Sequence, residues 1–182
     1  MLYKAIDIFI YIPTQMLSQV IRYTILIALF AMLSSCTTTF YLVRHAEKAN
    51  STPDTPLSAA GHARAEALRD TLISKNIKQI FVTNYLRTQQ TAAPLATQLG
   101  ITPTEIPGNQ TEQLVQQLKA IKGKNVLVVG HSNTVPVIIS GLMESPQNVT
   151  ITETDFDNLF KVKITKGGDR IIEFVELTYG EP

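Results

Sequence analysis

The stretch Phe40–Lys48, FYLVRHAEK, places an arginine and a histidine directly after a run of apolar residues. An uninterrupted run such as Phe40–Val43 is typical of a strand that is buried on both faces of a parallel sheet. Arg44 and His45 then fall where this strand ends. Because ligands of open α/β sheets bind beyond the carboxyl ends of the strands, the pair is either a solvated strand end or half of an anion site.

The rest of the chain alternates short apolar runs with helical patterns, which is typical of an α/β domain. We expect strands at Thr39–Val43, Gln79–Val82 and Asn125–Val129, and a C-terminal β-hairpin from Leu159–Ile164 and Arg170–Leu177. We expect helices from the N-cap Ser58 to Lys75, from Tyr85 to a stop at Gly100, over 111–121, and just after His131. The inner stripe of the first helix is expected at Ala65, Leu68, Leu72 and Ile73. The predicted fold is a three-layer α/β/α domain with a mostly parallel central sheet flanked by helices.

Polar loops follow the other two predicted parallel strands as well. Thr83–Arg87 comes after the second strand, and Gly130–Asn133 comes after the third. Because the carboxyl ends of parallel strands meet at one edge, we expect four basic side chains to converge there: Arg44, His45, Arg87 and His131. A planar guanidinium binds two phosphate oxygens at once, so this group predicts a phosphate site.

Each of these residues alone also has a plainer interpretation. A histidine such as His131 after a hydrophobic strand is usually structural, and an arginine such as Arg87 in a first helical turn is usually solvated. A zinc site at the two histidines is disfavoured, because the arginines repel a cation and no third ligand is apparent. His62, on the first predicted helix, is interpreted as a surface residue.

Four motifs, in this order, resemble the signatures of the histidine phosphatase superfamily, which has the phosphoglycerate-mutase-like fold. Leu42–Glu47 resembles R-H-G-E, and Leu57–Gly61 resembles L-S/T-x-x-G. Thr83–Ala92 is similar to S-x-x-x-R-A-x-x-T-A, and Gly130–Ser132 is similar to G-H-G/S. The family's phosphate-contacting asparagine would fall at Ser51, beside Asn50, so neither residue is assigned.

This resemblance implies a metal-independent phosphatase, without a cofactor, that hydrolyses phosphomonoesters or phosphoramidates. His45 would be the nucleophile that accepts the phosphoryl group, and Arg44, Arg87 and His131 would bind the phosphate. Positive charge from the arginines and from a protonated His131 would keep His45 unprotonated. Water would then hydrolyse the phosphohistidine. The alternative is a catalytically weak or inactive module that binds a phospho-ligand or a protein on the same fold.

The residue that protonates the leaving group stays open at this stage. Ser132 occupies the place of an aspartate that some members of the family use. Glu112 is weakly favoured and Glu105 lies in the same stretch, whereas Glu47 is expected to orient the site. Asp155 and Asp157, before the predicted strand at Leu159, are less favoured.

The N-terminal segment has a different character. The apolar run Tyr23–Leu33 follows Arg22 and is short for a membrane-spanning helix, which takes about 20 residues. Its end, Leu33–Cys36, resembles the lipobox of bacterial lipoproteins, in which the cysteine is lipidated. We therefore expect a lipoprotein signal peptide at 1–35, cleaved before Cys36, and a phosphatase-like domain at 36–182. The alternative is an uncleaved anchor with an incidental thiol, and Met16 is an alternative start.

These assignments place the protein in the bacterial cell envelope, lipid-anchored and either periplasmic or surface-exposed, with the choice of inner or outer membrane open. The formal net charge is +1, which gives no electrostatic case for nucleic acid or for an anionic membrane surface. A single cysteine excludes an internal disulfide. The expected partner is a phosphorylated small molecule or phosphoprotein. The sequence carries no signal for a particular oligomeric state.

Overall fold

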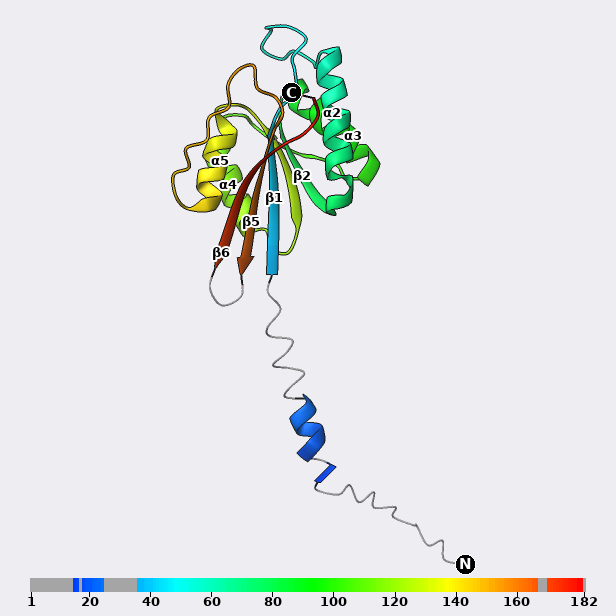
Figure 1. Ribbon diagram of the computed structural model, residues 1–182, viewed down its shortest axis with the longest axis vertical. Coiled ribbons are helices and arrows are strands. Elements are labelled where there is room, and N and C mark those ends of the chain that lie inside the picture. Colours follow the sequence, from blue (N-terminus) through cyan, green and yellow to red (C-terminus); the bar gives the residue numbers. More distant parts are fainter. Residues whose placement is uncertain (1–14, 17, 25–35, 167–169, 182) are drawn as a thin grey trace, which may run out of the picture. The chain divides into compact units, whose positions relative to one another are not determined.

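The computed structural model describes residues 15–16, 18–24, 36–166 and 170–181 (Figure 1). Contacts divide the chain into two units, residues 1–35 and residues 36–182. In the first unit, residues 15–16 and 18–24 are helical. Among the helices in the described ranges, none combines the length and the apolar character needed to cross a membrane. Most of the predicted signal peptide lies outside the described residues.

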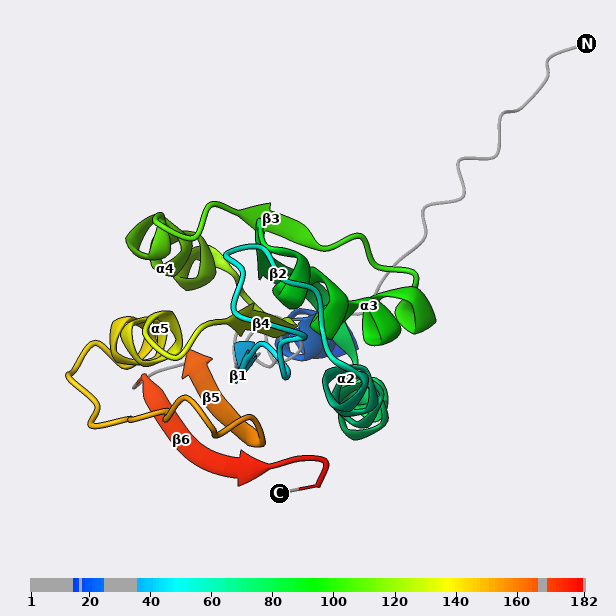
Figure 2. The same ribbon diagram turned by 90° about the horizontal axis from the view of Figure 1, so that it is seen from above.

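The second unit is built on a six-stranded sheet in the order β3-β2-β4-β1-β5-β6, which Figure 2 shows from above. The strands β3, β2, β4 and β1 are parallel, whereas β5 runs antiparallel to β1 and β6 antiparallel to β5. The strands are β1 Cys36–Arg44, β2 Ile77–Thr83, β3 Thr104–Ile106, β4 Asn125–Gly130, β5 Asn158–Lys166 and β6 Ile171–Thr178.

Helices cover both faces of this sheet, α2 and α3 on one side and α4 and α5 on the other (Figure 2). Their bounds are α2 Ala59–Leu72, followed by the 3-10 turn η1 Ile73–Lys75, α3 Leu86–Leu99, α4 Thr111–Ala120 and α5 Thr134–Met143. Successive side chains of β1 enter different cores. Phe40 and Leu42 pack with α4 and α5, and Tyr41 and Val43 pack with α2 and α3. Burial on both faces explains the uninterrupted apolar run of β1.

The predicted three-layer fold with its C-terminal hairpin is confirmed, and so are the helix ends. The Ser58 side chain accepts a hydrogen bond from the Gly61 amide, and Gly100 ends α3 in a left-handed conformation. Two details differ. Ile73 is exposed because it falls in η1 and not on the buried stripe of α2. The short, mostly exposed strand β3 carries too weak a pattern to be predicted.

Candidate active site

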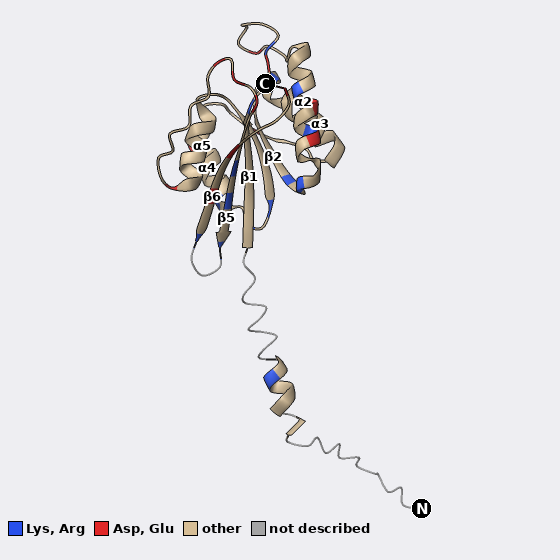
Figure 3. Cartoon of the chain, viewed as in Figure 1, with Lys and Arg blue, Asp and Glu red and all other residues tan. Residues whose placement is uncertain are grey.

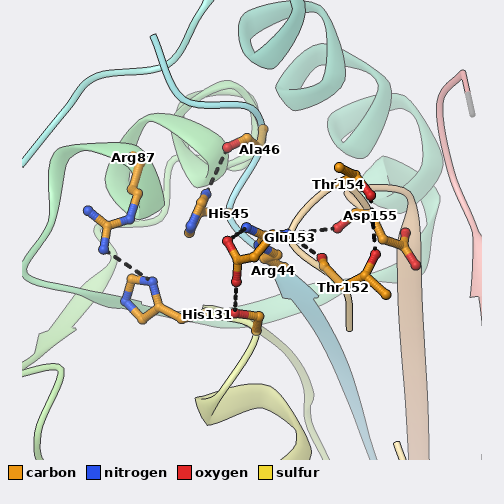
Figure 4. A network of polar contacts seen from close by, with 10 residues as sticks. Arg44, His45, Ala46, Arg87, His131, Thr152, Glu153, Thr154 and Asp155 are labelled. Carbon is orange, nitrogen blue, oxygen red and sulfur yellow. Dashed lines mark hydrogen bonds and ion pairs between the residues drawn. The ribbon is translucent and has the colours of Figure 1, made fainter. Parts of the chain in front are cut away.

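The structure brings the four predicted basic residues to one edge of the sheet (Figure 4). Arg44 is the last residue of β1 and pairs with Gly130, so His45 and His131 follow two neighbouring strand ends. The His45 amide donates to the Gly130 carbonyl at 2.9 Å, which extends the pairing by one residue. Arg87 is the second residue of α3, just beyond the end of β2.

The imidazole of His45 is buried and held in one tautomer. Its Nδ1 lies 2.8 Å from the carbonyl oxygen of Ala46, and because a carbonyl only accepts, Nδ1 carries the proton. Nε2 therefore keeps its lone pair. Burial is the main cause that lowers the pKa of His45 to about 3. Electrostatic repulsion from His131, Arg44 and Arg87 lowers it further. The ring is consequently neutral at pH 7, as a nucleophile must be.

His131 is also neutral and is the centre of a hydrogen-bond chain. Nη2 of Arg87 donates to Nδ1 of His131 at 3.4 Å, which places the ring proton on Nε2. Nε2 then donates to the Thr83 hydroxyl at 3.0 Å, which lies 2.9 Å from the hydroxyl of Thr88. Burial, followed by Arg87 and Arg44, lowers the pKa of His131 to about 4. The expectation of a protonated His131 is therefore corrected: the positive charge of the site comes from its arginines.

Each arginine of the site lies over an aromatic ring. The guanidinium of Arg87 is 4.4 Å from the centre of the Tyr85 ring, and that of Arg44 is 4.3 Å from the centre of the Phe156 ring. Tyr85 also packs edge-on against His131. Such stacking fixes the planes of both guanidinium groups and thereby the direction of their N–H donors.

Both arginines keep one buried donor that the protein does not use. The Nε atoms of Arg44 and Arg87 have no hydrogen-bond partner among the described residues. The terminal nitrogens do have partners: Nη1 of Arg44 donates to the carbonyls of Thr152 (2.6 Å) and Asp155 (3.2 Å), and Nη1 of Arg87 donates to that of Pro53 (2.7 Å). A buried guanidinium donor without an acceptor is costly, and both Nε atoms carry this cost.

Glu153 is a functional candidate that the sequence reasoning missed. Its Oε2 lies 2.9 Å from Nη2 of Arg44, and its Oε1 accepts a hydrogen bond from the Ser132 hydroxyl at 2.9 Å. The bond from Ser132, followed by the charge of Arg44, lowers the pKa of this carboxyl. A signal existed: β5 is antiparallel to β1, so the loop before Asn158 reaches the edge where the parallel strands end.

Of the acidic residues considered from the sequence, Asp155 contacts Arg44 through its backbone carbonyl, whereas the glutamates have other surroundings. Glu112 and Glu105 are exposed, and neither forms a hydrogen bond or ion pair with the four basic residues in the described part of the chain. Glu47 pairs with Arg64 at 2.7 Å, so it ties the loop after His45 to α2. His62 is exposed, in agreement with its interpretation as a surface residue.

Sequence comparison matches residues 40–108 to the histidine phosphatase superfamily (branch 1), a range that contains Arg44, His45 and Arg87. The PE-PGRS family protein PE_PGRS11 of Mycobacterium tuberculosis is 44% identical over 57 residues. That alignment covers 31% of this chain and 10% of the mycobacterial protein, so the similarity concerns a small part of its length.

Solved structures share the fold over most of the chain. Mycobacterial hydrolase 2 superposes with a TM-score of 0.66 at 12% identity, covering 81% of this chain and 94% of that one. Phosphoserine phosphatase of Entamoeba histolytica, in complex with 3-phosphoglyceric acid, gives 0.57 at 14% identity, with 80% and 98% covered. The protein histidine phosphatase SixA, complexed with tungstate, gives 0.55 at 17% identity, with 77% and 96% covered. Residues 40–108 are thus similar to the histidine phosphatase superfamily, and the solved structures show that the domain shares its fold with phosphatases.

Proposed function

We propose that the protein is a phosphatase that hydrolyses phosphomonoesters or phosphoramidates through a phosphohistidine on Nε2 of His45. One observation carries the proposal: a buried, neutral imidazole keeps a free Nε2 lone pair beside two guanidinium groups with unused donors. The sequence match around these residues supports the same chemistry.

In the first step, the Nε2 lone pair attacks phosphorus. A P–N bond forms while the bond to the leaving group breaks, and the leaving group takes the electron pair. Arg44 and Arg87 stabilise the phosphoryl oxygens, on which the negative charge is spread in the transition state. The Nδ1–H bond to the Ala46 carbonyl keeps the ring in the reactive tautomer.

In the second step, water attacks the phosphohistidine. The P–N bond breaks, its electron pair returns to Nε2 of His45, phosphate leaves, and the proton of the water passes to solvent. His131 positions Arg87 through its Nδ1 and contributes no charge of its own at neutral pH. Metal-free chemistry of this kind is part of the proposal.

The ionised state of Glu153 bears on the substrate. This carboxylate is tied to Arg44 and Ser132 with a lowered pKa, which makes it a poor acid at pH 7. Leaving groups that depart with little protonation, such as aryl oxides or the imidazole of a phosphohistidine, therefore suit the site better than alkoxides. Glu112 remains the alternative donor that the sequence suggests.

We further propose that the domain works in the bacterial cell envelope, attached through a lipid on Cys36. The lipobox-like sequence Leu33–Cys36 supports this. Cys36 is also the first residue of β1, and Arg44 is the last, so the thiol and the active site lie at opposite ends of one strand. A lipid on Cys36 would leave the site accessible to dissolved substrates.

The test is phosphate release from p-nitrophenyl phosphate without added metal, comparing wild type, His45→Ala and the exposed-histidine control His62→Ala. We expect activity in wild type and His62→Ala and none in His45→Ala. Brief reaction with a radiolabelled phosphoramidate should leave an acid-labile adduct on wild type that His45→Ala lacks. Absence of turnover over a broad substrate panel, with phosphate still bound, would favour the alternative, a phospho-ligand-binding module.

A further inference from the structure

Exposed basic side chains surround the end of the sheet that lies opposite the active site. We call this group the basic rim; its members are Lys75, Lys78, Lys122, Lys124, Lys166 and Arg170. Figure 3 shows basic residues at the lower ends of β2, β5 and β6, and acidic residues in the loops at the other end of the domain.

Strand pairing and hydrogen bonds bring the rim residues to one end although they are far apart in the sequence. Lys166 pairs with Cys36 at the start of β1. A backbone amide of β1 donates to the carbonyl of Lys124 at 3.1 Å. The side chain of Asn125, the first residue of β4, donates to the carbonyl of Lys75 at 2.6 Å.

The charge of the rim is largely uncompensated. Within the described ranges, its five lysines form no ion pair, and only Arg170 has a carboxylate partner, Glu144. Exposed carboxylates also lie at the active-site end, at Asp54, Glu153 and Glu181 in loops and at Glu112 in the first turn of α4. The net charge of +1 of the whole chain therefore does not reveal this local excess of positive charge at the rim. The expectation of no electrostatic case for an anionic membrane surface was based on net charge alone, which does not register a local group of lysines.

Two exposed isoleucines accompany the lysines. Ile171, at the start of β6, is 55% exposed, and Ile73, in η1, is 37% exposed. Lysines mixed with exposed apolar side chains are typical of surfaces that lie on a bilayer, where the ammonium groups meet anionic headgroups and the apolar groups enter the interface. The apolar run Tyr23–Leu33 precedes this same end of the domain in the sequence.

We propose that the basic rim is a docking surface for an anionic lipid bilayer, which holds the domain with His45 facing away from the membrane. A basic side chain near an anionic leaflet strengthens binding about fivefold. The inference needs neither the lipid on Cys36 nor phosphatase activity, so its test can fail independently of the proposed function.

The first experiment compares binding of the full chain to phosphatidylcholine vesicles with and without phosphatidylglycerol. Wild type should prefer the anionic vesicles, and added salt should remove the preference. The triple variant Lys75→Gln, Lys122→Gln, Lys124→Gln should lose at least about tenfold in affinity for anionic vesicles and nothing for neutral ones.

Two controls isolate local positive charge. Lys75→Arg, Lys122→Arg, Lys124→Arg keeps the charge and should bind as wild type does. The triple variant Asn109→Asp, Gln110→Glu, Gln113→Glu makes the same change in net charge in exposed residues around the start of α4, at the active-site end, and should keep the preference for anionic vesicles.

A second experiment reads the orientation. The chain contains no tryptophan, so Ile171→Trp and Leu177→Trp each give a single probe, at opposite ends of β6 and about 20 Å apart. Brominated phosphatidylglycerol should quench the fluorescence of Ile171→Trp and leave that of Leu177→Trp nearly unchanged. Equal quenching of both, or equal vesicle binding by wild type and the Lys→Gln variant, would overturn the proposal. Rim-dependent binding to duplex DNA without a vesicle preference would assign the rim to nucleic acid instead.

Discussion

Glu153 and Arg44 are joined by an ion pair of 2.9 Å in which the carboxylate occupies one side of the guanidinium group. An incoming phosphate must share Arg44 with this carboxylate or displace it. The Glu153 side chain is 74% exposed, so moving it aside costs little.

Replacing this carboxylate should make anion binding stronger. We predict that Glu153→Gln lowers the inhibition constant of inorganic phosphate severalfold, because the repulsion and the competition for Arg44 both disappear. The measurement is competitive inhibition of p-nitrophenyl phosphate hydrolysis. A large loss of kcat with unchanged phosphate inhibition would contradict this and would identify Glu153 as a proton donor.

Arg87 should not be replaceable by lysine. Its planar group lies over Tyr85, donates to His131 and keeps a free Nε, and an ammonium group cannot do all three. We expect Arg87→Lys to lower kcat/KM by about a hundredfold or more. Arg69→Lys, which changes a partly exposed arginine on α2 paired with Glu66 and Asp70, is the control and should be near wild type. A similar kcat/KM for both variants would argue against a role for the planar guanidinium group of Arg87.

Acid should destabilise the fold through the two buried histidines. The folded-state pKa is about 3 for His45 and about 4 for His131, whereas both should be near 6.5 in the unfolded chain. Below pH 6.5 the unfolded state binds more protons, so the free energy of unfolding falls as pH drops toward 4, by about 1.4 kcal/mol per pH unit for each histidine at most. Above pH 6.5 these two histidines do not change the free energy of unfolding with pH, because they are neutral in both the folded and the unfolded state.

Urea unfolding at pH 7 and pH 5 measures this effect. The double variant His45→Gln, His131→Gln should lose much less stability between the two pH values than wild type does. An equal loss in the two proteins would assign the acid sensitivity to other groups.

Gly61 should tolerate no larger residue. A Cβ atom at this position would lie 2.3 Å from the carbonyl oxygen of Glu47, so any side chain pushes α2 away from the loop that follows His45. We predict that Gly61→Ala costs about 1–3 kcal/mol of unfolding free energy, as overpacking does. Ala60→Ser, an exposed change in the same turn, should stay within about 0.5 kcal/mol. Thermal unfolding of both variants tests the difference.

The sequence predicted the fold well because its signals are local and strong. The buried strand β1 contains the unbroken apolar run Phe40–Val43, Ser58 caps α2, and Gly100 ends α3. The convergence of Arg44, His45, Arg87 and His131 followed from a general rule about where parallel strands end, together with a family resemblance. Such rules predict where backbone elements lie, and they therefore also predict the approximate positions of residues at strand ends.

Two features were missed, because they depend on how distant segments pair. Glu153 belongs to the loop over 145–157, whose path depends on the antiparallel pairing of β5 with β1 and not on any pattern within the loop. The neutral state of His131 depends on its burial and on the hydrogen bond from Arg87, which only the assembled site reveals. Both arise from contacts between segments that are distant in the sequence.

The pairing of β1 also determines when the domain can fold during synthesis. Phe40 lies beside Val126 on one side and Val162 on the other, so the earliest strand to leave the ribosome has partners that are made much later. Until those partners emerge, its apolar residues have no sheet to join, and a chain dominated by such distant contacts folds slowly and is prone to aggregate. Nascent chains of this protein should therefore depend on chaperones that hold β1 until β5 has been translated.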